Sequence, residues 1–97
     1  MMISSKIRFS KSDTTDGFGF NCMKTAYSLR IKGRLDYYPG GENQIIAEGE
    51  ENSLQDFIAW IKNNIEDTNQ FTCHNSLICS GIFKEFDIFL HTAIQPF

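Results

Sequence analysis

Basic clusters, long apolar runs and an even set of cysteines are all lacking from this sequence. Nine basic and twelve acidic residues give a net charge of −3, and no basic run is present. We therefore expect no binding to nucleic acid or to an anionic membrane surface. The first six residues hold no apolar segment of the kind found in secretion signals, and no apolar run approaches the length of a membrane span. Three cysteines without metal-site spacing are typical of a reducing compartment, so we expect a cytoplasmic protein.

Repeats, linkers and low-complexity tracts are absent as well, which indicates one domain over residues 1–97. Hydrophobic residues make up 41% of the sequence, and nine residues are phenylalanine. A chain of this length can bury a single core without disulfides or a structural metal. We expect a monomer that needs no cofactor. Its partner, a small molecule or a protein, is not identified by the sequence.

The hydrophobic pattern of the first half alternates with loops and turns. Ile3, Ile7 and Phe9 alternate as in a strand, and Met23 and Ala26 fall at helical spacing. The predicted elements are a strand over residues 2–9, a loop over 10–19, a helix over 22–29, a strand over 34–38, a turn at 39–41 and a strand over 44–48. Pro-Gly-Gly at 39–41 has the composition of a hairpin turn.

The second half contains the clearest helical pattern in the chain. One apolar stripe at helical spacing is formed by Leu54, Phe57, Ile58, Ile61 and Ile65. Asn52 and Ser53 are suitable N-caps for this helix. A fourth strand is expected within residues 71–83 and a short fifth over 86–90. The order predicts an α+β fold, a ferredoxin-like split β-α-β sandwich in which two helices cover one face of a four- to five-stranded antiparallel sheet.

The loop before the first helix has glycines on both sides of a phenylalanine and carries no cation. Its candidate binding residues are Thr15, Asp16, Gly17, Phe18, Gly19, Phe20 and Asn21. Free backbone N–H groups and the helix dipole make such a loop a good cradle for an anion. A doubly charged anion normally needs a basic side chain as well. No arginine lies between Arg8 and Arg30, and Asp13 and Asp16 add negative charge.

This loop resembles the signature of the acylphosphatase family, in which Gly-x-Gly-Phe or Gly-x-Phe-Phe is followed directly by arginine. Residues 33–41 resemble the family's second motif, which runs glycine, tryptophan, valine, any residue, asparagine and then a proline-glycine turn. Residues 45–51 are similar to its third strand and the following turn. The face that Leu54, Phe57, Trp60 and Ile61 form is similar to its second helix, and residues 86–88 resemble its last strand. The resemblance covers about residues 6–90.

The resemblance implies an enzyme that hydrolyses acyl phosphates without metal or covalent intermediate. In the family, the loop amides and the arginine hold the phosphoryl oxygens, and the asparagine of the second motif orients the attacking water. Asn21 stands at the arginine's place and Tyr37 at the asparagine's. The chain is two residues shorter than the family between Asn21 and Ala26, and if this gap lies in the loop, Gly19 takes the arginine's place instead. Neither alignment supplies a cation.

Asp16 corresponds to a loop glutamine of the family and places a carboxylate beside the expected anion. Two like unit charges ~4 Å apart repel by about 1 kcal/mol in water and about 4 kcal/mol at the dielectric of a protein surface. The loss of one transition-state donor lowers a rate on the order of 10²–10³-fold. We therefore expect a non-catalytic binding or interaction module. The alternative is an acyl phosphate hydrolase with a rearranged site, in which Lys11 or Lys24 supplies the missing charge instead of remaining a solvated surface lysine.

Other chemistry-bearing residues are assigned to ordinary roles. Asp13, Asp16 and Asp36 lack the further ligands of a calcium loop. Cys73 and Cys79 are too far apart on one strand to share a zinc ion, so they are expected in the core, with His74 facing solvent. His91 is expected at the surface as a neutral histidine. By family analogy Phe20 is expected to be buried. No metal site is predicted.

Overall fold

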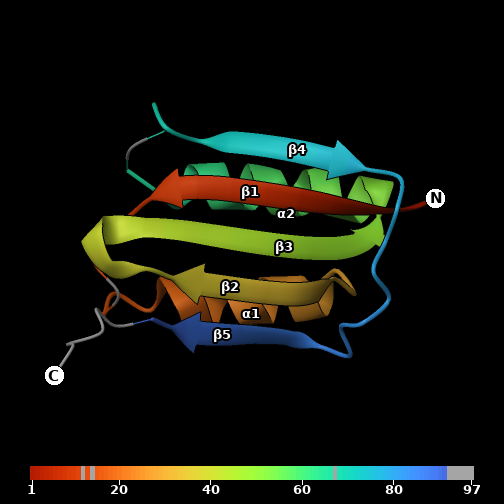
Figure 1. Cartoon of the computed structure of the whole chain (residues 1–97), viewed down its shortest axis with the longest axis horizontal. Coiled ribbons are helices and arrows are strands. Elements are labelled where there is room, and N and C mark those ends of the chain that lie inside the picture. Colours follow the sequence, from red (N-terminus) through yellow and green to blue (C-terminus); the bar gives the residue numbers. More distant parts are fainter. Residues whose placement is uncertain (12, 14, 67, 92–97) are drawn as a thin grey trace, which may run out of the picture.

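The computed structural model describes residues 1–11, 13, 15–66 and 68–91. Within them the chain forms a five-stranded sheet and two α-helices (Figure 1). The elements are β1 Met2–Ser10, α1 Phe18–Ser28, β2 Lys32–Tyr37, β3 Glu42–Glu50, α2 Glu51–Asn63, β4 Thr72–Ser76 and β5 Phe86–Leu90, with a 3₁₀ turn, η1, at Pro39–Gly41 between β2 and β3. No helix in this part of the chain has both the length and the apolarity needed to cross a membrane.

The strand order β4-β1-β3-β2-β5 is that of the predicted ferredoxin-like α+β sandwich, which is confirmed. Both helices lie on one face of the sheet and leave the other face open (Figure 1). The sheet is mixed rather than wholly antiparallel, because β5 pairs with β2 in parallel. The chain crosses one end of the sheet from β4 to the opposite edge (Figure 1), so β5 enters in the direction of β2.

The core lies between the helices and the inner face of the sheet. Ile3, Ile7 and Phe9 of β1 point into it, as their alternation predicts. From α2, Leu54 and Phe57 are fully buried, together with Ile61 one turn further on. The predicted apolar stripe is therefore the buried face of the helix.

Both helices begin earlier than the sequence pattern predicts. Helix α1 starts at Phe18 rather than at residue 22, because Gly17 adopts a left-handed φ of 83° and Phe18 joins Cys22 and Ala26 on the buried face. Helix α2 starts at Glu51, directly after β3. Asn52 therefore lies inside the first turn, and neither it nor Ser53 is the N-cap.

Gly33 makes the close approach between β2 and β3 possible. A Cβ atom there would lie 1.8 Å from the carbonyl oxygen of Ile46, which is far inside van der Waals contact. The residue also has a φ of 154°. The position therefore requires glycine, because a larger residue would prevent this pairing of β2 and β3. The same pairing places Tyr37 beneath α1.

Candidate functional site

The loop between β1 and α1 is folded by two of its own carboxylates. The backbone N–H and the hydroxyl of Thr15 both donate to Oδ1 of Asp13, at 2.8 and 2.7 Å. The N–H of Phe18 donates to Oδ1 of Asp16 at 3.0 Å. Phe18 is the first residue of α1, so the Asp16 carboxylate lies where the helix N-terminus attracts negative charge. One N–H group of the helix N-terminus is thus already bonded to a side chain of the loop.

Lys11 supplies the positive partner of that carboxylate. Its ammonium forms an ion pair with Oδ2 of Asp16, and it lies 5.5 Å from the centre of the Phe18 ring. The Lys11 side chain is only 11% exposed, so the expectation of a solvated surface lysine is wrong. The hydrogen bond from Lys11, followed by that from the Phe18 N–H, lowers the pKa of Asp16 below its ordinary value. The carboxylate is therefore ionised at neutral pH and neutralises the charge of Lys11.

Tyr37 lies under the first turn of α1 with its hydroxyl buried. A Cβ atom on Gly19 would lie 3.0 Å from that hydroxyl, so the absence of a side chain at Gly19 makes room for the phenol. Within the part of the chain that the structure describes, the hydroxyl has no hydrogen-bond partner. Burial, with smaller contributions from Cys22 and Asp16, raises the pKa of Tyr37 to about 12. Tyr37 is therefore a neutral, inward-facing phenol.

Asn43 is a buried polar residue that sequence reasoning missed. It pairs across the sheet with both Tyr37 and Phe9. Its Nδ2 donates to the carbonyl of Lys11 at 3.0 Å, while its Oδ1 has no partner among the described residues. The available signal was its place in the alternating pattern of β3, where it shares the inner face with Ile45. Asn43 fixes the backbone at the start of the loop.

The remaining loop residues divide between core and solvent. Phe18 is buried, with its ring 5.6 Å from that of Phe9 and 5.5 Å from that of Trp60. Phe20 is 59% exposed, so its predicted burial is wrong. Only one of the two phenylalanines can face the core, because they are two residues apart on a helix. Lys24 lies over the exposed ring of Phe20, away from Asp16.

Asn21, which the sequence resemblance aligns with the arginine in one of its two registers, is exposed on α1. Its Nδ2 would lie 3.8 Å from a Cβ atom on Gly17, so the amide is beside the loop without being buried in it. Its carbonyl accepts a hydrogen bond from Thr25. An exposed amide at this position can donate a hydrogen bond but adds no charge.

A small pocket of about 260 Å³ opens beside the loop, and its charge is acidic. Asp13, Asp16 and Glu66 line it, with Lys11 as the one basic lining residue that the structure describes. Gly40 and Gly41 of the turn after β2 complete its wall. Because Lys11 is paired with Asp16, the pocket presents unneutralised carboxylates to any ligand that enters. That charge disfavours a phosphate group.

Asp36, the third aspartate that the sequence analysis considers as a possible cation ligand, lies away from the loop. Asp36 is on the open face of the sheet, 2% exposed, and accepts hydrogen bonds from Arg34 and from Nε2 of His91, the latter at 2.7 Å. Burial alone would raise the pKa of Asp36, but these hydrogen bonds lower it below its ordinary value. His91 lies at the surface, as predicted, where it also stacks on Tyr38.

The expectations for the cysteines and for His74 have different outcomes. Cys73 and Cys79 are half-buried rather than core residues, and His74 is exposed as predicted. Among residues 1–11, 13, 15–66 and 68–91, no group of three or more histidine, cysteine or carboxylate side chains could hold a metal ion.

Comparison with known proteins identifies the fold. No protein-family model and no curated protein sequence matches the chain. An acylphosphatase from Bacillus subtilis superposes with a TM-score of 0.74 at 25% identity, and the match covers 91% of this chain and 98% of that one. An acylphosphatase from Coxiella burnetii superposes with a TM-score of 0.70 at 17% identity, over 90% and 92% of the two chains. The chain has an acylphosphatase-like fold.

The acylphosphatase-like fold is not restricted to acylphosphatases. BlrB, a BLUF protein solved in its dark state, superposes with a TM-score of 0.68 at 18% identity, and the match covers 92% of this chain and 72% of that one. Because such different proteins share the fold, function has to be argued from the site itself.

Proposed function

We propose that this chain is an acylphosphatase-like domain that does not hydrolyse acyl phosphates and acts as a binding or interaction module. The observation that carries the proposal is the ion pair between Lys11 and Asp16 at the start of α1. An acyl phosphate would have to displace a carboxylate that is held by both the helix N-terminus and the lysine.

Catalysis in this fold also needs a polar group to place water in line with the phosphoryl group. Tyr37 stands at the matching position, and its hydroxyl faces the underside of α1 at Gly19. A phenol with a pKa of about 12 stays protonated at neutral pH, so it is not a base for the water. Both side chains that the family uses are thus replaced by groups without the required charge or reach.

The ligand that suits the loop pocket is neutral or cationic. Asp13 and Glu66 line the pocket and take no part in the ion pair of Lys11. Carboxylates in this arrangement attract ammonium or guanidinium groups and repel phosphate. A basic side chain of a protein partner fits this chemistry.

A second candidate function, an acylphosphatase-type hydrolase with a rearranged site, is favoured by one observation. Lys11 directly follows β1 and its ammonium lies at the loop, so a cation is present there if Asp16 releases it. In that case Lys11 would hold the phosphoryl oxygens in place of the missing arginine. The two functions differ in whether the Lys11 ammonium is free to bind the phosphoryl group of a substrate.

The deciding experiment is hydrolysis of benzoyl phosphate at neutral pH. We expect the wild-type protein to release phosphate no faster than buffer. Turnover that Lys11→Ala removes, and that Lys24→Ala leaves intact, would instead establish the rearranged hydrolase. Lys24 is the matched control because it is a lysine of α1 that lies over Phe20 and not at the loop carboxylates.

A further inference from the structure

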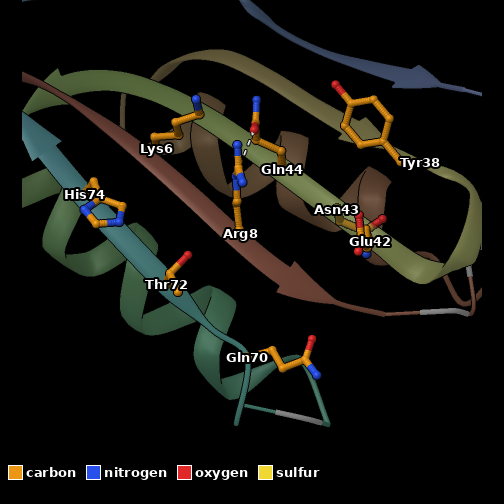
Figure 2. A pocket seen from close by; sticks show the side chains of 9 residues that line it. All are labelled: Lys6, Arg8, Tyr38, Glu42, Asn43, Gln44, Gln70, Thr72 and His74. Carbon is orange, nitrogen blue, oxygen red and sulfur yellow. Dashed lines mark hydrogen bonds between the residues drawn. The ribbon is translucent and has the colours of Figure 1, made fainter.

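The open face of the sheet carries a larger groove whose charge is opposite to that of the loop pocket. Its volume is about 810 Å³, within the range of small-molecule sites. Figure 2 shows Lys6, Arg8 and Gln44 together at its middle. In the part of the chain that the structure describes, Glu42 is the one carboxylate that lines it.

The β-sheet register brings the basic groups together. Lys6 and Arg8 are two residues apart on β1, so both side chains point to the same face. His74 of β4 is the direct cross-strand partner of Lys6, and Thr72 is that of Arg8. Gln44 of β3 lies on the other side of Arg8. Donors from three adjacent strands therefore converge on one part of the groove (Figure 2).

These cations are not neutralised within the described part of the chain. No carboxylate there forms an ion pair with Lys6 or Arg8, whereas Lys11 and Arg34 each have one. The contact of Arg8 is a neutral one, from Nε to Oε1 of Gln44 at 3.3 Å. Both side chains are exposed, so an anion can reach them without displacing a protein group.

An aromatic ring stands at the other end of the groove. Tyr38 follows β2 and stacks on His91, with 4.5 Å between ring centres and 11° between planes. Tyr38 itself lines the groove, on the β2 side of β3 (Figure 2). β1 and β2 flank β3, and Arg8 lies opposite Gln44 whereas Tyr38 lies opposite Glu42, so the backbones of Arg8 and Tyr38 are about 12 Å apart across the sheet.

We propose that this groove binds a small ligand in which a planar aromatic ring is joined to an anionic group, the chemistry of a nucleoside monophosphate. The phosphate would lie against Lys6 and Arg8, and the ring against Tyr38. Glu42 is at the Tyr38 end, where it can accept hydrogen bonds from hydroxyl or amino groups of the ligand. The site is on the face away from the helices, so it does not depend on the proposed loss of hydrolysis.

The test is a titration of the full chain with adenosine monophosphate, followed by amide NMR shifts and calorimetry. We expect shifts on β1, β3 and β4 around the groove, and a measurable dissociation constant. Lys6→Gln combined with Arg8→Gln should weaken binding by roughly tenfold to a hundredfold, since two charged hydrogen-bond donors are lost. Lys24→Gln, which removes one positive charge from α1, should change affinity by less than about twofold because the site is distant and screened.

Two further arms separate the ring from the phosphate. Inorganic phosphate should bind more weakly than the nucleotide, and Tyr38→Leu should reduce nucleotide affinity while leaving phosphate affinity unchanged. Equal affinity for phosphate and nucleotide would overturn the aromatic part of the proposal. No shifts at millimolar nucleotide, or an equal loss in Lys24→Gln, would overturn the site as a whole. The substituted side chains are exposed, and the amide spectrum of each variant reports whether its fold is retained.

Discussion

The loop and the open face of the sheet each hold lysine or arginine side chains, but the two regions differ in what surrounds these cations. At the loop, Lys11 is nearly buried and forms an ion pair with Asp16, which also accepts a hydrogen bond from the N–H of Phe18, the first residue of α1. On the open face, Lys6 and Arg8 are exposed and have no ion-pair partner among the described residues. The comparison teaches that a lysine near a helix N-terminus does not by itself make an anion site. When a carboxylate already forms an ion pair with that lysine, the affinity of the site for an anion is low.

The largest effect is expected from a substitution that disturbs both regions at once. Gly33→Ala puts a Cβ atom 1.8 Å from the Ile46 carbonyl oxygen, so β2 and β3 must separate. We expect a loss of about 3 kcal/mol or more in the free energy of unfolding, measured by urea denaturation.

Gly40→Ala is the matched control for Gly33→Ala. Gly40 also has a positive φ, but a Cβ atom there meets nothing within 4 Å. Only backbone strain remains, which is about 1 kcal/mol. Equal losses in the two variants would contradict the assignment of Gly33 to a steric contact between strands.

A substitution at Asp16 should make the two regions more alike. Asp16→Asn keeps an oxygen that can accept from the Phe18 N–H, removes the negative charge and leaves Lys11 unpaired. We expect phosphate to bind at the loop roughly tenfold more tightly than in the wild type, because one repulsive charge is lost and one cation is gained. The measurement is the shift of the Gly17 and Gly19 amides during a phosphate titration.

Asp13→Asn controls for net charge, since Asp13 bonds to Thr15 and not to Lys11. It should raise phosphate affinity at the loop much less than Asp16→Asn does. If the two variants gain equally, general charge and not the ion pair explains the loop.

The buried hydroxyl of Tyr37 provides a smaller test of the loop region. Its oxygen has no hydrogen-bond partner among the described residues, so Tyr37→Phe removes a polar group whose burial destabilises the folded protein. We expect the free energy of unfolding to rise by about 1 kcal/mol, measured by thermal or urea unfolding. A clear fall instead would mean that the hydroxyl makes a stabilising contact, and that the phenol is more than a packing group.

The smallest effect is expected from the pH dependence of the Lys11–Asp16 pair. The pKa of Asp16 is lower in the folded protein than its ordinary 3.8, so its contribution to stability is present above that value and disappears as pH falls through the lowered pKa. Asp16 is 40% exposed, so we expect this contribution to be below about 1 kcal/mol. Urea midpoints of wild type and Asp16→Asn should converge on acidification. A difference that persists below both pKa values would contradict the ion pair as its source.

The fold could be predicted from local patterns, and the site could be predicted only in part. The alternation of β1 and the stripe from Leu54 to Ile61 identified the core faces because they depend on local periodicity. The parallel pairing of β5 could not be found in this way, since it depends on where the chain crosses the sheet. The acylphosphatase-like fold followed from motifs spread along the chain.

At the loop, the contacts of Lys11 and Asn43 form only once the chain has folded. Lys11 meets Asp16 only when the loop folds back onto β1, and Asn43 reaches the Lys11 carbonyl only across paired strands. Nothing in the spacing of these residues specifies those contacts. The convergence of Lys6 and Arg8 with Tyr38 likewise depends on β-sheet register, which single-sequence patterns do not give.

The most direct test of the difference between the two regions is a titration of the wild-type protein with inorganic phosphate, followed at every backbone amide. The account predicts that amides around Lys6 and Arg8 shift, while those of Gly17 and Gly19 stay in place. Saturable shifts at Gly17 and Gly19 in the unmodified protein would contradict it, because they would place an anion where Asp16 is held by Lys11.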